Sequence, residues 1–200
     1  TWNLFFESGN AGSVMPLAIG GAIMGFIFAL VTIFKKQYSG ITAPLYALSQ
    51  GLFLGAISGI FEMQYPGIVI QAVGLTLGTL ASLLFLYKTG IVKPTENFRL
   101  MVTSATMGIG VLYLVSMVMN MFGAGGIGFI HSNGLFGIGF SLFVVAIAAL
   151  NLVLDFDFIE QGSEMGAPKY MEWFGAFSLM VTLIWLYLEM LRLLAKLRSR

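Results

Sequence analysis

The sequence predicts an all-α membrane protein that crosses the bilayer several times. Only 10% of its 200 residues are charged, whereas 58% are hydrophobic. The apolar residues form continuous segments of about 20 residues, the length of helix that crosses about 30 Å of hydrocarbon. They do not alternate with polar residues as the strands of a membrane barrel do. Composition therefore outweighs chain length, which alone would suggest one soluble domain.

Six segments are long and apolar enough to span the membrane, and their ends are marked by charges or turn residues. The first ends at Lys35 and Lys36, the second before Pro66 and the third at Lys88, while the fourth follows Arg99. We expect the six helices at residues of about 15–34, 42–61, 68–87, 100–122, 135–159 and 171–194.

Lysine and arginine in the loops predict the orientation, because cytoplasmic loops carry an excess of both. The loop after the first span holds Lys35 and Lys36, and the loop after the third holds further basic residues. The alternate loops hold none, and the only histidine, His131, lies in one of them. We therefore place the loops after the first, third and fifth spans in the cytoplasm. The basic tail, residues 196–200, would then lie outside. Either this tail is a tolerated exception, or the last loop enters the membrane without crossing it.

The composition also limits the classes of function. The chain has no cysteine, which excludes disulfides, thiol catalysis and thiolate metal sites. Its net charge is +1, and no basic cluster resembles a nucleic-acid-binding surface, so we expect no nucleic-acid partner. No pairing of nucleophile and base is evident. We therefore expect a protein that is not an enzyme and has no resident cofactor.

The start of the sequence suggests a segment before it. The chain begins at Thr1 without an initiator Met, and Trp2 is typical of the interfacial end of a membrane helix. We expect a further helix to precede this sequence. No linker or repeat is evident, so we treat residues 1–200 as a single integral-membrane domain.

The most informative polar residues lie near the end of the fifth span, at Asn151, Asp155, Asp157 and Glu160. Asn151 and Asp155 are four residues apart and share a helix face. A carboxylate in hydrocarbon is costly, so acids within spans often mark an ion or proton path. We interpret Asp155 as a titratable gate, with a structural ion pair as the alternative. For Asp157 and Glu160 we expect a solvated helix end, with Glu160 beginning the loop.

The sixth span also carries charged residues. Glu172 opens it, and Glu189 lies in its last turns with Arg192 three residues later. Because residues three apart are neighbours on a helix surface, an ion pair between Glu189 and Arg192 near the interface is the simplest expectation.

Glycines recur at a spacing of four in two spans. They are Gly51, Gly55 and Gly59 in the second span and Gly74 and Gly78 in the third. Small residues at this spacing let membrane helices approach closely. We expect these glycines to pack helices of the same chain, and a dimerisation face is the alternative.

Two segments near the C-terminus carry a recognisable pattern. They are IAALNLVLDFDFI, residues 147–159, and LYLEMLRLL, residues 186–194. Together with APLYALSQGLFLG, residues 43–55, they resemble the prokaryotic branch of the Bax inhibitor-1 family. The resemblance implies a seven-helix bundle with its last helix enclosed by the others, which agrees with a helix before this sequence. It also implies a location in the bacterial cytoplasmic (inner) membrane.

The family is associated with a pH-sensitive calcium leak and, in bacteria, with control of a membrane-bound AAA protease. Its gate is a pair of aspartates on the last two helices, latched by a basic residue. By resemblance Asp155 is the first acid, although Leu154 replaces the family's tyrosine, and Glu189 stands for the second aspartate. Lys35 or Lys36 lies where the latching arginine is expected, but lysine cannot make the same bidentate contact.

The connection between the two acids is longer than the family's turn. A regular helix from Glu172 would put Glu189 about 25 Å along its axis, too far to meet Asp155. The two acids could share a proton only if the stretch before Ala176 bends back. Otherwise Asp155 would pair with Glu172 or Asp157.

The residues and the resemblance together predict a passive, pH-sensitive leak for Ca²⁺ or H⁺. Asp155 and Glu189 would form its gate, with Asn151, Asp157 and Glu172 along the ion path. The two gate carboxylates would offer hard oxygen ligands to a transient calcium ion. The alternative is a regulatory protein that transports nothing. Its partner, besides the lipid bilayer, would be another membrane protein such as an AAA protease.

Overall fold

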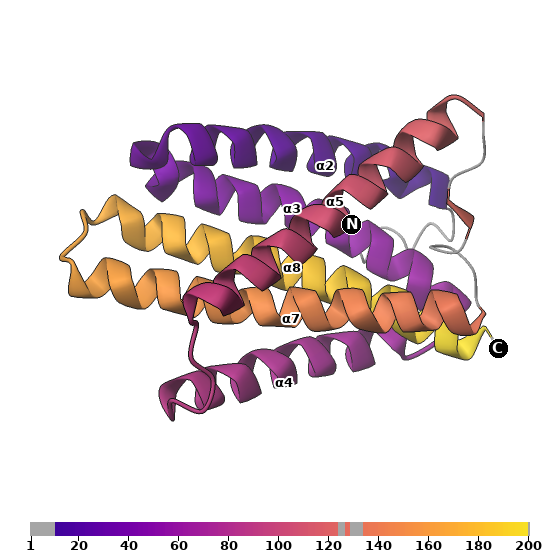
Figure 1. The fold of residues 1–200 in the computed structure, drawn as a ribbon. Coiled ribbons are helices and arrows are strands. Elements are labelled where there is room, and N and C mark those ends of the chain that lie inside the picture. The colour runs from indigo at the N-terminus through magenta and orange to yellow at the C-terminus, as the bar shows by residue number, and fades with distance from the viewer. Residues whose placement is uncertain (1–10, 124–126, 129–133, 200) are drawn as a thin grey trace. The chain divides into compact units, whose positions relative to one another are not determined.

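The computed structural model describes residues 11–123, 127–128 and 134–199, and Figure 1 shows the fold. Trp2 and His131 lie outside these residues. In the described ranges every regular element is a helix, which confirms the all-α fold class. The elements are α2 (Ala11–Phe34), the 3-10 helix η1 (Lys36–Tyr38), α3 (Ser39–Gln64), α4 (Ile68–Lys88), α5 (Glu96–Met121), α7 (Leu135–Glu164) and α8 (Tyr170–Arg198).

Among the described residues, six helices are long and apolar enough to cross a membrane, and each coincides with a predicted span. Many of their large apolar side chains are exposed, as expected where lipid rather than water is the solvent. The chain is therefore an integral membrane protein. Helices α7 and α8 contain 30 and 29 residues, so each is long enough to cross by itself. The side of the membrane on which the basic tail lies stays a prediction.

Helix α7 is longer than the sequence predicts. It continues to Glu164, so the expectation that Glu160 begins a loop is wrong. The polar residues after Ile159 extend the helix because none of them breaks it. The helix ends where Gly166 adopts a φ of 61°, which lets the Ala167 N–H donate to the Gly162 carbonyl oxygen at 2.9 Å. A glycine in this left-handed conformation is a common helix terminator.

The chain divides into two compact units. Unit 1 comprises Thr1–Ile70 and Phe158–Val181, and unit 2 comprises Gln71–Asp157 and Thr182–Arg200. Each unit therefore contains part of α7 and part of α8. The single domain expected over residues 1–200 stays a prediction.

In unit 1, α2 and α3 lie side by side (Figure 1) and are connected through η1. Gly21 of α2 makes their closest approach possible. A Cβ atom at Gly21 would lie 2.6 Å from the backbone oxygen of Ser49 on α3. Further along the pair, Thr32 Oγ1 donates a hydrogen bond of 2.7 Å to Thr42 Oγ1. These contacts join two helices that have few polar groups with which to associate in lipid.

The glycines that allow helices to approach closely differ from those that the sequence predicted. A Cβ atom on Gly51, Gly74 or Gly78 would meet nothing within 4 Å, so the expectation of tight packing at these three positions is wrong. All three are exposed. Close approach uses Gly21 and Gly25 instead, which stand at the same spacing of four in α2. Spacing alone does not determine which way a helix face turns.

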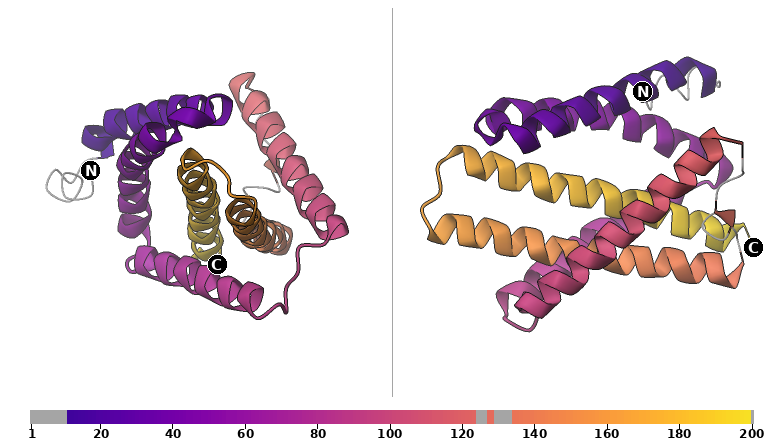
Figure 2. Two further views of the ribbon diagram at one scale, coloured as in Figure 1. Left: turned by 90° about the vertical axis from the view of Figure 1, so that its left-hand side faces the viewer. Right: turned by 45° about the horizontal axis from the view of Figure 1, so that its top comes forward.

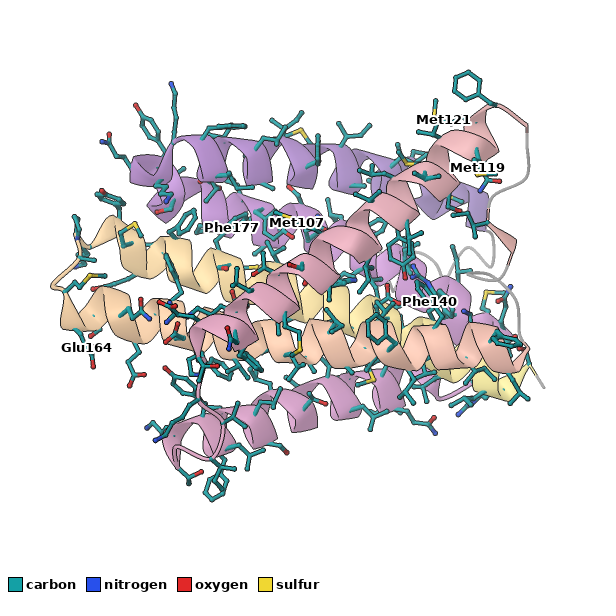
Figure 3. All side chains as sticks on the ribbon, in the orientation of Figure 1. Met107, Met119, Met121, Phe140, Glu164 and Phe177 are labelled. Atoms are coloured by element: carbon teal, nitrogen blue, oxygen red, sulfur yellow. The ribbon has the colours of Figure 1, made fainter. Side chains whose placement is uncertain are left out.

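In unit 2, α5 crosses α7 obliquely (Figures 1 and 2). Ile109, Val144 and Ile147 form a buried apolar cluster between them. Phe140, labelled in Figure 3, extends this contact on the α7 side. The two helices are antiparallel, as shown by three side-chain contacts: Tyr113 with Phe140, Thr106 with Asn151, and Arg99 with Asp157.

Candidate functional site

An ion pair with a buried carboxylate on α8 is the centre of the first polar cluster in unit 2. Arg192 Nη1 donates to Glu189 Oε1 at 2.7 Å, and the Tyr113 hydroxyl on α5 donates to the same oxygen at 3.0 Å. Arg192 Nη1 also donates to Tyr113 Oη at 2.8 Å, and its guanidinium carbon lies 5.3 Å from the Tyr113 ring centroid. We call Tyr113, Glu189 and Arg192 the Glu189 cluster.

The pairing follows from the sequence, whereas the burial does not. The ion pair expected between Glu189 and Arg192 is confirmed. It was expected near a wet interface, but Glu189 is only 1% exposed and its neighbours Met190 and Leu191 are buried too. A carboxylate in such a place is stabilised only when a cation and hydrogen-bond donors replace its lost hydration. Arg192 and Tyr113 supply both.

Lys196 is a second buried cation, about two turns beyond Glu189 on α8. It is 5% exposed, and its Nζ donates to Ser141 Oγ at 2.8 Å and to the Gly137 carbonyl oxygen at 3.0 Å. The sequence grouped Lys196 with the basic tail, but α8 continues to Arg198 and places Lys196 against the start of α7.

Asp155 lies in a different part of unit 2. Asp155 is 7% exposed, and Asn151, one turn earlier on the same face of α7, is partly buried. Asn151 Nδ2 donates to Thr106 Oγ1 on α5 and to the Ile147 carbonyl oxygen, both at 2.8 Å. The two polar side chains predicted to share a face are thus both withdrawn from the surface.

We expect Thr106→Val to lower the free energy of unfolding by about 0.6 kcal/mol, the average for a hydrogen bond between membrane helices. The substitution removes the α5 acceptor of the Asn151 amide and keeps the shape of the side chain. Unfolding in mixed detergent micelles would measure the change. Thr103→Val is the control, because Thr103 is exposed on the same helix. Equal stability of Thr106→Val and wild type would contradict a contribution from this hydrogen bond.

The sequence suggested that Asp157 lies at a solvated helix end, but the structure shows that it does not. Its Oδ2 lies 2.6 Å from Arg99 Nη2, and its side chain is mostly buried. Glu160 is exposed, in agreement with a solvated position. The ion pair joins α7 to the first turn of α5, which the sequence could not indicate because the two residues are far apart in the chain.

Asp155 and Glu189 lie at different levels of unit 2. Tyr113 contacts both Glu189 and Phe140, so these three residues share one level. Asp155 follows Phe140 on α7 by roughly four turns, or about 22 Å along the axis. Helix α8 continues without a break from Tyr170, so the bend considered before Ala176 does not occur. The two acids therefore neither share a proton nor bind one ion together in this structure.

The remaining predicted site residues lie in unit 1. Lys36 Nζ lies 4.8 Å from the centroid of the Phe174 ring, and Lys35 Nζ lies 6.0 Å from that of Tyr38. Both are cation–π contacts. Glu172 is exposed in the first turn of α8, where the helix dipole favours an acid. The latch role of either lysine stays a prediction.

Within the described residues, no group of three or more His, Cys, Asp or Glu side chains lies together as metal ligands would. The family model described as Bax inhibitor 1 like matches residues 1–199. The chain belongs to this family. No curated protein and no solved structure gives a significant match. The match to the Bax inhibitor 1 like family includes all six predicted spans, whereas the resemblance noticed in the sequence was clearest over α7 and α8.

Sequence reasoning missed several residues of this Bax inhibitor 1 like chain that complete the polar clusters. They are Arg99, Thr106, Tyr113, Ser141 and Lys196, each of which becomes important only through a partner on another helix. One signal could have found Lys196. Glu189, Arg192 and Lys196 stand at positions i, i+3 and i+7, which is the pattern of one helix face.

Proposed function

We propose that this protein is a passive, pH-sensitive leak for calcium ions or protons, that it is not an enzyme, and that its membrane is a bacterial inner membrane. One observation carries the proposal. Unit 2 contains two carboxylates, Asp155 and Glu189, that are both buried within membrane-spanning helices. Retaining such acids in a bilayer is costly, and an ion or proton path is their most common use.

Glu189 is the gate in its closed state. Its Oε1 is held by Arg192 and Tyr113, while its buried Oε2 accepts no hydrogen bond from the residues that the structure describes. Oε2 can therefore take up a proton or meet a passing cation. Arginine stays charged at all physiological pH values. Protonation of Glu189 thus removes the charge that holds Arg192, and this couples the gate to pH.

Asp155 is a second ion-binding position along the path. A cation meets Asp155 and Glu189 in succession, because about 22 Å along the helix axis separates their levels. In the orientation predicted from the loop charges, Asp155 is the position nearer the cytoplasm. Single carboxylates hold calcium weakly, since tight sites use six to eight oxygen ligands. Weak successive sites suit permeation.

We expect calcium flux into proteoliposomes that exceeds the flux into empty vesicles and that changes when the pH is varied. Asp155→Asn and Glu189→Gln should each reduce this flux toward that of empty vesicles, since each removes one carboxylate of the ion path. Glu164→Gln is the matched control. Glu164, labelled in Figure 3, is an exposed carboxylate at the end of α7, and its removal should leave the flux unchanged.

Flux of the wild type no greater than that of empty vesicles, with the protein folded, would reject the leak. Flux that persists unchanged in both site variants would place the ion path elsewhere. Circular dichroism and gel filtration of each variant before reconstitution would show whether it is folded.

A regulatory protein is the second candidate, and a cavity in unit 1 favours it. The cavity has a volume of about 720 Å³ and lies at the connection between α7 and α8, with Ile159, Met165, Pro168 and Met171 among its lining residues. An apolar recess of this kind can receive a side chain of a partner membrane protein such as a protease. This candidate predicts no flux, and Asp155→Asn should leave partner binding intact.

A further inference from the structure

Unit 2 contains a cavity beside the Glu189 cluster that the proposed leak does not require. Its volume is about 420 Å³, within the range of small-molecule sites. It lies at the C-terminal end of α5, where Figure 3 labels Met119 and Met121. The lining residues are Tyr113, Ser116, Met117, Asn120, Met121 and Arg192.

Arg192 presents unused hydrogen-bond donors in this cavity. Both of its described hydrogen bonds, to Glu189 and Tyr113, come from Nη1. A guanidinium carries five N–H groups, so the edge formed by Nε and Nη2 retains three donors for which the described residues provide no acceptor. The side chain is 38% exposed. This edge is the one with which arginine binds a phosphate or carboxylate through two parallel hydrogen bonds.

The other walls suit an anion attached to hydrocarbon. Ser116 and Asn120 add a hydroxyl and an amide, and the Ser116 hydroxyl accepts from the Ile127 N–H at 3.3 Å. Met117 and Met121 contribute exposed, flexible apolar side chains. Methionine adapts its shape to a variable apolar ligand. The cavity thus combines one cationic edge, two polar groups and an apolar rim.

We propose that this cavity binds a phosphate group, with the Nε and Nη2 edge of Arg192 as its main ligand. The phosphate belongs to a lipid head group or is free in solution, and the methionine rim favours the lipid. Basic pockets between membrane helices are known places for phospholipid head groups. This binding is independent of the leak, because it uses the edge of Arg192 that faces away from its bonds to Glu189.

Native mass spectrometry of the full chain in detergent would test the site with three probes. Phosphatidylglycerol carries the phosphate, diacylglycerol has the same chains without it, and inorganic phosphate is the free anion. We expect one phosphatidylglycerol bound per chain and no comparable retention of diacylglycerol. Displacement by inorganic phosphate would assign the site to the free anion, and resistance to displacement would assign it to the lipid.

Two variants locate the site. Arg192→Lys keeps the charge beside Glu189 but loses the bidentate edge, and Met117→Trp fills the cavity while leaving the ion pair intact. Each should weaken phosphatidylglycerol binding roughly tenfold or more. The controls are Arg198→Lys, on the same helix, and Met107→Trp, an exposed methionine of α5 outside the cavity. Met117→Trp keeps the test decisive if Arg192→Lys does not fold.

Two results would overturn the proposal. Equal retention of phosphatidylglycerol and diacylglycerol would show that the phosphate group is not recognised. Wild-type binding by the folded Met117→Trp variant would show that phosphate binds somewhere other than this cavity.

Discussion

Replacement of Arg192 by alanine is expected to lower the free energy of unfolding by about 2–3 kcal/mol, somewhat less than the roughly 3–5 kcal/mol lost when a fully buried ion pair is broken. The loss arises because Glu189, at 1% exposure, would lose the cation that offsets the cost of burying its carboxylate. It is smaller than for a fully buried pair because Arg192 is partly exposed. The hydrogen bond from Tyr113 would remain and would offset part of the loss.

A double-mutant cycle would separate this effect from lost packing. Glu189→Gln removes the buried charge, so adding Arg192→Ala to it should cost less than Arg192→Ala alone. Unfolding by SDS in mixed micelles would measure all four proteins. Arg198→Ala is the control, since Arg198 is exposed about two turns further along α8 and should change stability little. Additive losses for Arg192→Ala and Glu189→Gln would show that the two residues do not stabilise each other.

Gly21→Ala should destabilise the protein by about 1–3 kcal/mol, the usual cost of an atom forced into a packed interface. The new Cβ would lie 2.6 Å from the Ser49 backbone oxygen and 3.0 Å from the Phe53 backbone nitrogen. Backbone atoms cannot turn aside as a side chain can. Helices α2 and α3 would therefore have to separate, which also weakens their other contacts.

Gly20→Ala provides a control of opposite sign. Its Cβ would meet nothing within 4 Å, and alanine favours the helix over glycine by about 1 kcal/mol, so this variant should be as stable as the wild type or more so. Gly25→Ala should fall between the two, because the nearest atom is the movable Gln50 amide nitrogen. Thermal unfolding in one detergent would rank the three. A Gly21→Ala protein as stable as Gly20→Ala would contradict the close approach.

The helices could be predicted from the sequence because the information that defines them is local. A run of apolar residues of sufficient length forms a helix in lipid, where each backbone group must find its partner within the segment. The same holds for the Glu189–Arg192 pair, whose spacing along one helix decides that the two side chains meet. The predicted end of α7 was wrong because the polar residues were taken to mark the end of the helix. The helix is instead terminated by Gly166, which adopts the left-handed conformation.

The candidate site could be predicted only in part. Asp155 was singled out as a costly charge and Glu189 by the family resemblance, and both are buried. Whether the two acids meet was left open between a regular and a bent last helix, and the unbroken α8 decides for separation. The partners Tyr113 and Thr106 were not evident, since a tyrosine or threonine in an apolar span carries no sign of its function.

By itself, the sequence determined the fold class, the six spans, the pairing along α8 and the shared face of Asn151 and Asp155. Each depends on hydrophobic length or helical periodicity, which act between residues close in the chain. Only the tertiary structure decided that Gly21 rather than Gly51 meets a neighbouring helix. It also decided that Glu189 and Asp155 stand at separate levels. The rotation and stagger of packed helices set both outcomes, and these depend on residues distant in the sequence.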